Sequence, residues 1–431
     1  MTDSTTDLVP THPPASRTPL PAPDQNAWPE LSDTPDTPFK GRVAKSLMKR
    51  AVRKMPVRVT FPDGTTWGKG DASSPELAVA SSAGLFNRIG DQTKIGLGEA
   101  YMVGDWSAGP DTDLAELLTP FAARLTKLVP APLQKLRTLV DIDLPGSDRN
   151  TTEGSRANIE AHYDLSNDLF TRFLDPTLSY SSAWFASDDE TLEAAQVRKM
   201  DGILDQAAVT EGSRVLEIGS GWGSLAIRAA QRGATVTTIT LSQEQAALAQ
   251  QRFEEAGVAD QIEIRLQDYR EVPESETGTY DAIVSCEMIE AVGEEFWPTY
   301  FQTIDRLLAP GGRVSIQAIT MAHHRYRTTR RSYGWIQKYI FPGGLIPSEK
   351  AIDLSLAKHT GLRVTSRRPL GIHYARTLRL WRDEFNANFG EISHFGFDET
   401  FRRMWEFYLA YCEAGFATGY LDVVQIQMQR R

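Results

Sequence analysis

Val215-Leu-Glu-Ile-Gly-Ser-Gly-Trp-Gly-Ser224 is the stretch around which the rest of this chain is organised. Its apolar start predicts a β-strand, its three glycines predict a tight turn, and Leu225 to Ala230 has helical spacing. A glycine turn between a strand and a helix lets a ligand approach bare backbone and the amides of the helix N-terminus. The stretch therefore predicts a ligand site at a strand-to-helix turn.

Two kinds of ligand bind at such a turn. A dinucleotide site favours a third glycine where this chain has Ser224, and an acid after the next strand, where it has Thr240-Leu-Ser242. Glu217, shortly before the first glycine, instead matches the pattern of S-adenosylmethionine (AdoMet) methyltransferases. We favour AdoMet, with a nicotinamide or flavin site as the alternative.

Length and composition limit the class of protein. The 431 residues are enough for two domains, and 41% hydrophobic with 24% charged residues is typical of a soluble globular protein. No run approaches the ~18 apolar residues of a membrane-spanning helix, and the N-terminus has no signal-peptide pattern. Cys286 and Cys412 are the only cysteines, which excludes a disulfide scaffold. The histidine spacing indicates no metal site, and the net charge of −10 argues against generic nucleic-acid binding.

The composition divides the chain into three parts. Residues 1–38 are rich in Pro, Thr, Asp and Ser and predict a disordered acidic tail. Residues 39–148 predict a smaller α+β domain, with a hairpin at Pro62-Asp-Gly64 and a turn into a helix within Ile95–Trp106. Residues 149–431 alternate strands and helices, which predicts a doubly wound, Rossmann-like α/β sheet.

Two segments combine basic and apolar residues. Lys40 to Arg58 contains eight basic residues and no acid, and it predicts a basic amphipathic helix. Either a solvated face of the domain or contact with an anionic membrane surface explains this pattern. Arg325–Phe341 interleaves cations with aromatic rings, and we favour lipid headgroups over nucleic acid as its partner.

A family resemblance rests on two further motifs, His162-Tyr-Asp-Leu-Ser-Asn-Asp-Leu-Phe170 and Leu174-Asp-Pro-Thr-Leu-Ser-Tyr-Ser-Ser-Ala-Trp-Phe185. With the glycine turn, they resemble the cyclopropane-fatty-acyl-phospholipid synthase family, which includes mycolic acid cyclopropane synthases and related lipid C-methyltransferases. The resemblance runs from about residue 40 to the C-terminus. It implies a class I methyltransferase fold and transfer of the AdoMet methyl group to the cis double bond of an unsaturated, oleoyl-like phospholipid acyl chain.

The resemblance also implies which residues bind AdoMet. In the family, the segment matching Thr240 to Gln245 lies along the ribose and methionine, and an acid at Asp268 is suited to accept from the adenine amine. Singly, each polar residue is more often a helix cap or a surface group, and it is their order along the chain that favours a site. The expected set is Tyr163, Tyr180, Ser181, Glu217, Gly219, Gly221, Gly223, Thr240, Leu241, Ser242, Gln245, Gln267, Asp268 and Tyr269.

The implied reaction site follows the fourth strand of the sheet, at Glu287 and Glu290. Better-known family members use bicarbonate as the base, held by a cysteine, a glutamate, a histidine and a tyrosine. Ser182 and Gln317 occupy the cysteine and histidine positions here, so a bicarbonate site is in doubt, whereas Glu290 and Tyr374 match. Because Glu287 stands at a glycine position, we predict that it replaces bicarbonate as proton acceptor, oriented by Glu290, Gln317 and Tyr374.

Several questions stay open at the level of sequence. Cys412 matches a family position near the reaction site, but we favour a buried structural thiol, because no adjacent base or cation is visible in the sequence. The product is either a cyclopropane or a methylene-branched chain, as in the bacterial pathway to 10-methyl-branched (tuberculostearic) acids. The rivals are a small-molecule or protein methyltransferase and a non-catalytic AdoMet- or lipid-binding protein. We expect a cytoplasmic enzyme at the inner face of the membrane, and the sequence leaves a homo-oligomer open.

Overall fold

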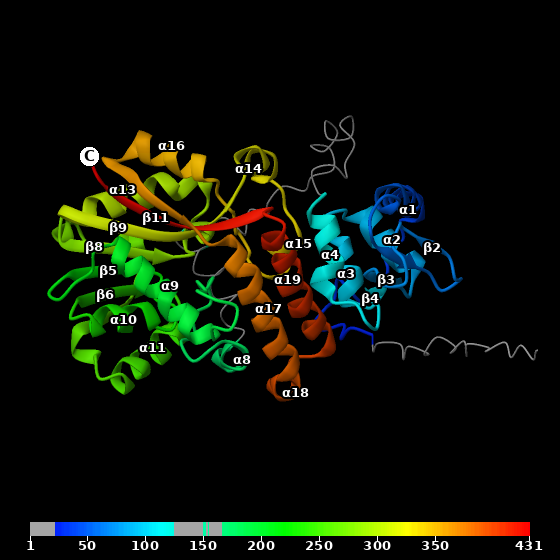
Figure 1. The fold of residues 1–431 in the computed structure, drawn as a ribbon, viewed down its shortest axis with the longest axis horizontal. Helices are drawn as coiled ribbons and strands as arrows, with labels where there is room; N and C mark the ends of the chain where they lie inside the picture. The colour runs from blue at the N-terminus through cyan, green and yellow to red at the C-terminus, as the bar shows by residue number, and fades with distance from the viewer. Residues whose placement is uncertain (1–21, 125–149, 152–153, 155–165) are drawn as a thin grey trace, which may run out of the picture.

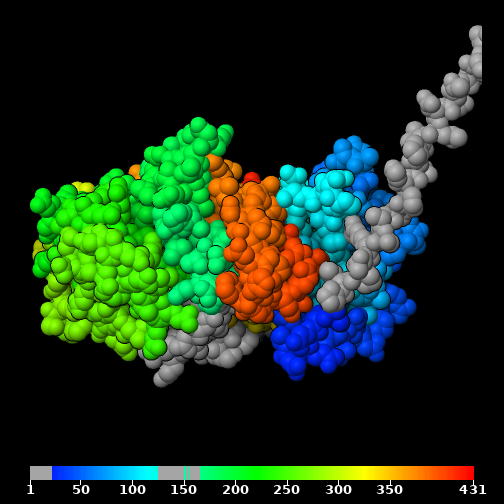
Figure 2. Space-filling model, turned by 90° about the horizontal axis from the view of Figure 1, so that it is seen from below, coloured from blue at the N-terminus to red at the C-terminus, as the bar shows by residue number. Residues whose placement is uncertain are grey.

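Two β-sheets organise the molecule. The computed structural model describes residues 22–124, 150, 151, 154 and 166–431. A four-stranded sheet lies in the N-terminal unit and a seven-stranded sheet in the C-terminal unit. The long helices α17 (Gly371–Ala387) and α19 (Glu399–Ala417) lie between the two, as Figures 1 and 2 show.

The N-terminal unit combines a small sheet of strand order β2-β1-β3-β4 with helices. Val59 pairs with Trp67 in an antiparallel ladder, so the predicted hairpin is present. The predicted turn into a helix before Trp106 is also present, as α3. The elements are α1 (Pro38–Val52), β1 (Arg58–Thr60), β2 (Thr66–Trp67), β3 (Glu76–Val79), α2 (Ser82–Asp91), α3 (Gly96–Met102), β4 (Trp106–Ala108) and α4 (Leu114–Ala122).

The C-terminal unit contains the doubly wound sheet that the sequence predicts. Its strand order is β10-β11-β9-β8-β5-β6-β7, and neighbours from β9 to β7 are parallel, whereas β11 is antiparallel to both β9 and β10. Chain order reverses direction at β5, which places a ligand crevice at the carboxyl ends of β5 and β8. The strands are β5 (Arg214–Ile218), β6 (Thr235–Thr240), β7 (Ile262–Leu266), β8 (Tyr280–Cys286), β9 (Leu308–Met321), β10 (Leu362–Pro369) and β11 (Leu421–Arg430).

Helices cover both faces of this sheet. Val215 packs in one apolar cluster with α9, α10 and α11, whereas its neighbour Leu216 packs in another with α13 and α16. Successive residues of a strand point to opposite faces, so one hydrophobic strand serves both clusters. The helices are α8 (Asn167–Thr171), α9 (Leu192–Gln206), α10 (Ser224–Gln231), α11 (Gln243–Glu255), α12 (Ile289–Val292), α13 (Trp297–Leu307), α14 (His323–Thr329), α15 (Trp335–Tyr339), α16 (Glu349–His359) and α18 (Phe389–Ile392).

The two units share a hydrophobic core around α19. One cluster of buried side chains contains residues of both, among them Trp106, Trp381 and Trp405. Arg403 donates to the carbonyl oxygens of Tyr101 and Trp106, which ties α19 to the N-terminal unit. The boundary predicted near residue 148 lies outside the described residues and stays a prediction.

The disordered tail predicted for residues 1–38 does not extend over residues 22–37. Residues 1–21 lie outside the described residues, but residues 22–37 pack against both units. Trp28 Nε1 donates to Asp398 Oδ2 at 2.9 Å, and the Leu31 side chain is buried. Arg88 donates to the carbonyl oxygens of Leu31 and Asp33. The prediction is wrong for residues 22–37 because these apolar side chains find partners far away in the sequence.

The predicted basic amphipathic helix is present as α1, which ends at Val52. In the second basic segment, Arg325–Phe341, two of the cations form ion pairs with carboxylates of the same chain. Arg330 pairs with Glu294, and Lys338 pairs with both Glu99 and Glu30. No helix of the described residues has the length and apolar character needed to cross a membrane.

Candidate active site

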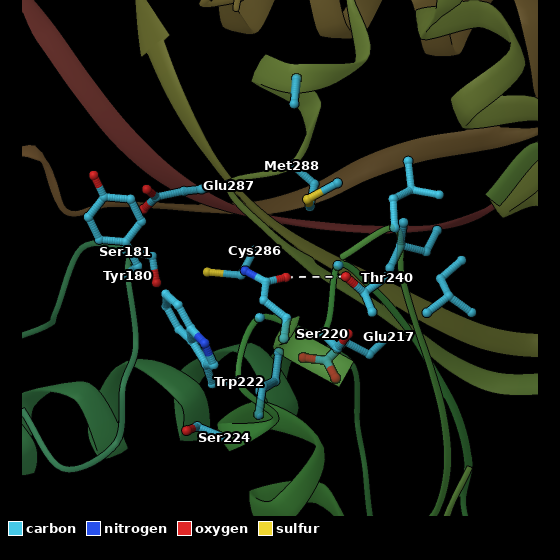
Figure 3. Close-up of a pocket in the computed structure, with 18 of the residues that line it drawn as sticks. Tyr180, Ser181, Glu217, Ser220, Trp222, Ser224, Thr240, Cys286, Glu287 and Met288 are labelled. Atoms are coloured by element: carbon cyan, nitrogen blue, oxygen red, sulfur yellow. Dashed lines mark hydrogen bonds between the residues drawn. The ribbon is translucent and has the colours of Figure 1, made fainter. Parts of the chain in front are cut away.

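A pocket opens at the carboxyl ends of β5, β6, β7 and β8. Figure 3 shows Glu287, Ser181 and Tyr180 on one side of it and Glu217, Ser220 and Thr240 on the other, with Cys286 and Trp222 between. We call Glu217, Ser220 and Thr240, together with the glycine turn, Gln267 and Asp268, the cofactor end. The Glu287 end comprises Glu287 and the residues that hold its carboxylate, Ser182, Gln317 and Tyr374. Methyl donor and acceptor sites are expected to meet in such a crevice.

The glycine turn gives the cofactor end its shape. Gly219 and Gly221 have φ angles of +93° and +48°, which favour glycine. A Cβ atom at Gly221 would meet nothing within 4 Å, so bare backbone borders open space there. Gly223 was expected to bind the ligand but does not line the pocket. It caps α10 with a φ angle of +87°, and a Cβ atom there would lie 2.4 Å from the Phe253 ring, so backbone conformation and close packing both require glycine.

Most of the residues expected to bind AdoMet line this pocket. Ser242 does not: its hydroxyl accepts from the Gln245 amide and caps α11. Tyr163 lies outside the described residues. Those in the lining are Tyr180, Ser181, Glu217, Gly219, Gly221, Thr240, Leu241, Gln245, Gln267, Asp268 and Tyr269.

Two acids at this side of the pocket have different hydrogen-bond partners. Glu217 is buried and accepts a 2.6 Å hydrogen bond from Thr238, and burial raises its pKa to about 8. Asp268 is also buried, but its two oxygens accept from the guanidinium of Arg270 at 2.9 and 2.6 Å. A carboxylate has about four lone-pair sites, so Asp268 keeps capacity to accept from an adenine amine.

The cofactor end holds buried polar atoms without a partner in the described residues. Ser220 Oγ and Gln267 Oε1 are both inaccessible and unbonded, and both residues line the pocket. Because such atoms are costly to bury unless a ligand satisfies them, they fit a polar ligand such as AdoMet. Sequence reasoning missed Ser220, Trp222 and Lys199. The first two lie within the glycine turn, where a signal existed, whereas Lys199 lies in α9, where no motif marks it.

The Glu287 end brings together four segments far apart in the sequence. Glu287 Oε1 accepts from the Ser182 amide at 2.9 Å and from Gln317 Nε2 at 2.8 Å. Its Oε2 accepts from the Tyr374 hydroxyl at 2.8 Å. Gln425 donates to Gln317 Oε1, which turns the NH₂ group of Gln317 toward the carboxylate. Glu287 lines the pocket, and its three donors fix the carboxylate from behind.

Glu287 has an unusual backbone conformation. Its φ angle is +52°, in the left-handed region, and its amide donates to the Gln317 carbonyl oxygen at 2.7 Å. A residue with a side chain loses roughly 1–2 kcal/mol in this region. Such strain persists when the surrounding structure holds it and is common at functional sites. A glutamate at this position thus keeps a glycine conformation while adding a carboxylate.

Glu290 forms no direct hydrogen bond with Glu287. Its Oε1 accepts from the Ile319 amide, and its Oε2 has no partner in the described residues. Burial raises the pKa of Glu290 to about 8, and the nearby Glu287 adds to the rise. Burial also raises the pKa of Glu287, although its three donors oppose this. Glu290 thus bonds to the β9 backbone and not to Glu287, and its orienting role stays a prediction.

Ser182 and Cys412 were also expected near the reaction. Ser182 acts through its backbone: its hydroxyl donates to the Ala183 carbonyl oxygen, and its amide holds Glu287. Cys412 packs against the shared hydrophobic core, and burial raises the pKa of its thiol to about 12. A thiol in that state is neutral at physiological pH and a weak nucleophile or base.

Comparison with known proteins gives consistent matches. Residues 150–426 match the family model described as mycolic acid cyclopropane synthetase. The chain is 47% identical over 420 residues to the tuberculostearic acid methyltransferase UfaA1 of Mycobacterium tuberculosis, covering 95% of this chain and 97% of that protein. It is 34% identical over 364 residues to the cyclopropane-fatty-acyl-phospholipid synthase of Escherichia coli, covering 84% and 89%. Both alignments are longer than the family-model match and so include part of the N-terminal unit.

A solved structure supports the same relationship. The mycolic acid cyclopropane synthase CmaA1, complexed with SAH and CTAB, matches with a TM-score of 0.58 and 33% identity. The match covers 64% of this chain and 98% of that one. The C-terminal unit thus has the class I methyltransferase fold that the sequence predicts.

Proposed function

The chain belongs to the mycolic acid cyclopropane synthetase family of AdoMet-dependent methyltransferases, and we propose that it methylates the cis double bond of an unsaturated phospholipid acyl chain. We propose further that the product is a methylene-branched chain. The observation that carries this proposal is the Glu287 carboxylate, held by three donors at the edge of the pocket. The likeness to a tuberculostearic acid methyltransferase supports the branched product.

The proposed chemistry follows from the weak reactivity of an alkene. AdoMet supplies a methyl group made electrophilic by its sulfonium. One alkene carbon bonds to this methyl carbon, S-adenosylhomocysteine leaves, and the neighbouring alkene carbon becomes a carbocation. A hydride shift moves the positive charge to the methylated carbon, and loss of a proton from the new methyl group gives an exocyclic methylene. Alignment of the alkene in an apolar site is the main contribution expected from the protein.

Glu287 is the proposed proton acceptor. Its carboxylate borders the pocket, and the negative charge would stabilise the acyl carbocation before taking its proton. The donors at Ser182, Gln317 and Tyr374 stabilise the ionised form, which a base requires. In this proposal Glu287 occupies the role that bicarbonate plays in better-known relatives, so no bicarbonate is needed.

The direct test is product analysis. Phospholipid vesicles with or without a cis-unsaturated chain are incubated with the protein and with AdoMet labelled in its methyl group. Label should enter lipid only when the unsaturated chain is present, and mass spectrometry after ozonolysis should locate an exocyclic methylene. A cyclopropane resists ozonolysis and would overturn the branched product. Label in soluble amines or protein, or no transfer by folded protein, would overturn the lipid assignment.

Bicarbonate dependence provides a second test of the base. Activity of the wild-type protein should stay unchanged when bicarbonate is removed by degassing under CO₂-free gas. A rate that falls without bicarbonate and returns on its addition would show that Glu287 is not the acceptor.

For access to phospholipid we propose that α1 lies on the anionic inner face of the membrane. Phe39, Val43 and Leu47 have 72%, 47% and 45% of their surface exposed, and their spacing of four residues puts them on one stripe. Exposed cations surround the stripe, namely Lys40, Arg42, Arg50, Arg53 and Lys54. An apolar stripe flanked by cations is typical of helices that lie in a lipid interface.

Lys45 and Lys49 have a different role within α1. Their ammonium groups lie 5.5 Å from the ring centroids of Phe61 and Trp67, respectively, on the side that packs against the domain. Charge reversal at Arg42, Arg50 and Lys54 is therefore a cleaner test of membrane contact than reversal at these two lysines.

Vesicle co-sedimentation tests this membrane proposal. Binding to vesicles containing phosphatidylglycerol should exceed binding to pure phosphatidylcholine and should weaken with salt, since charges are screened within about 8 Å at physiological ionic strength. The Arg42→Glu, Arg50→Glu and Lys54→Glu variant should lose this binding. Reversal of the exposed Arg313, Arg363 and Lys350 changes the net charge equally and is the matched control. Equal binding by both variants would contradict the role of α1.

A further inference from the structure

A buried lysine borders the pocket at Ser181 and Cys286. Lys199 of α9 is only 2% exposed and lines the pocket. Its Nζ lies 2.7 Å from Ser181 Oγ and 3.8 Å from Cys286 Sγ. Figure 3 shows Ser181 and Cys286 on neighbouring parts of the pocket wall, so the lysine tip lies where their side chains meet.

Unlike the buried Arg88 and Arg382, Lys199 has no carboxylate partner in the described part of the chain. Arg88 pairs with Asp105, and Arg382 pairs with Asp113 and Glu413. Lys199 forms no ion pair with a carboxylate of the described residues. An ammonium group has three donors, and only two have an acceptor here. An unpaired buried charge is costly, so the site calls for an anion.

The neighbouring groups of the pocket do not supply this anion. Burial raises the pKa of the Cys286 thiol to about 11, which keeps the thiol neutral. Glu217 bonds to Thr238, and burial raises its pKa to about 8. Glu287 acts on Lys199 only through space, because its oxygens accept from other donors and make no direct contact with the ammonium. The direct anionic contact that is missing is one that a ligand can supply.

We propose that Lys199 binds the α-carboxylate of the methionine part of AdoMet, with the Ser181 hydroxyl as its neighbour in the same contact. AdoMet carries a sulfonium, an ammonium and a single carboxylate, so a lysine repels two of its charged groups and attracts one. Lys199 thus fixes the direction in which the methionine tail lies. The inference rests on AdoMet use by this chain and not on the proposed acyl substrate.

A matched pair of ligands isolates the contact. S-adenosylhomocysteine and its decarboxylated form, S-adenosyl-3-thiopropylamine, differ only in the carboxylate. Titration calorimetry with the full-length protein should show tighter binding of the first by about tenfold to a hundredfold, the range of charge-assisted hydrogen bonds. Equal affinity of the wild-type protein for the two ligands would overturn the proposal without any variant.

Variants complete a double-mutant cycle between the residue and the ligand group. In Lys199→Met the preference for S-adenosylhomocysteine should disappear, mainly through weaker binding of that ligand. Gln267→Leu, at the other side of the pocket, is the matched control and should weaken both ligands equally. Persistence of the wild-type preference in Lys199→Met, or an equal loss for both ligands, would overturn the proposal. Thermal unfolding should show that Lys199→Met is folded, since it loses an unpaired buried charge.

The binding experiment is independent of the methylation experiment. S-adenosylhomocysteine binding needs no acyl chain, so an unexpected lipid product would leave the Lys199 result unchanged. Conversely, a preference for the carboxylate that depends on Lys199 would stand even if the acceptor were not a phospholipid.

Discussion

The two ends of the pocket are built differently. The cofactor end comes from neighbouring strand ends, with Glu217 and Ser220 at β5, Thr240 at β6 and Gln267 after β7. The Glu287 end joins residues that lie up to 192 positions apart, Ser182 to Tyr374, in four separate segments. The cofactor end therefore follows from the fold alone, whereas the Glu287 end depends on contacts specific to this chain. Changes at the first should alter AdoMet affinity, and changes at the second should alter turnover.

Replacing Glu287 with glutamine should give the largest effect. If Glu287 is the base, turnover in Glu287→Gln should fall by about 10²- to 10⁴-fold, the usual contribution of a positioned acid or base. The affinity for S-adenosylhomocysteine should stay within about twofold, because the substitution leaves the cofactor end intact. Steady-state kinetics on vesicles and titration calorimetry measure the two quantities. A near-normal rate in Glu287→Gln would contradict the assignment of turnover to the Glu287 end.

Glu287→Gly is the matched control for this prediction. Glycine accepts the φ angle of +52° without strain, so the free energy of unfolding should hold or rise while the base is lost. The vacated space should admit bicarbonate, which is expected to restore part of the rate in Glu287→Gly and none in Glu287→Gln. If both variants keep full activity without added bicarbonate, Glu287 is not the base.

Most residues expected to bind AdoMet line the pocket, and the sequence signals that mark them are local. The strand, turn and helix around Gly219 and Gly221 follow from apolar spacing and from glycine itself. A local pattern cannot distinguish a ligand contact from a packing contact, which is why Gly223 and Ser242 were assigned to the ligand. Gly223 instead packs on Phe253, which lies one strand and one helix further along the chain.

Two other differences between expectation and structure also have nonlocal causes. Glu290 was expected to orient Glu287, but its carboxylate bonds to the Ile319 amide of β9. Which of two nearby acids faces a pocket depends on backbone geometry such as the left-handed conformation of Glu287. Residues 22–37 were expected to be disordered, yet Trp28 reaches Asp398 at the start of α19. Such a contact has no signature in the composition of the segment itself.

Tyr374→Phe should give the next largest effect. The Tyr374 hydroxyl lowers the pKa of Glu287 by donating to its carboxylate, so its removal should raise that pKa. Turnover at neutral pH should fall about tenfold to a hundredfold, the value of a hydrogen bond to a charged group. The acidic limb of the turnover profile should move to higher pH, and part of the rate should return as pH rises. An unshifted limb would assign Tyr374 a purely structural role.

Glu290→Gln should change the pH dependence of protein stability. This would separate Glu290 from its neighbour Glu287, whose replacement should change turnover. In the folded protein Glu290 has a pKa of about 8, whereas the unfolded chain releases this proton near 4.5. The folded state therefore binds the extra proton between these values, and the associated stability is lost as pH rises through about 8. Thermal unfolding from pH 5 to 8.5 should show a steeper loss for the wild type than for Glu290→Gln. Parallel curves for the two proteins would mean that Glu290 is already ionised in the folded state.

Ser220→Ala should give the smallest effect, and it tests the cofactor end alone. Ser220 Oγ is buried without a partner in the described residues, so its hydroxyl is free to bond to a bound ligand. Losing one neutral hydrogen bond of about 0.5–1.5 kcal/mol should weaken S-adenosylhomocysteine binding about twofold to tenfold. Because Glu287 and its three donors are untouched, turnover at saturating AdoMet and its pH profile should match the wild type. Stability of the ligand-free protein should hold or rise slightly, since the substitution removes an unsatisfied buried group. A change in the pH profile without a change in affinity would mean that the two ends of the pocket are coupled.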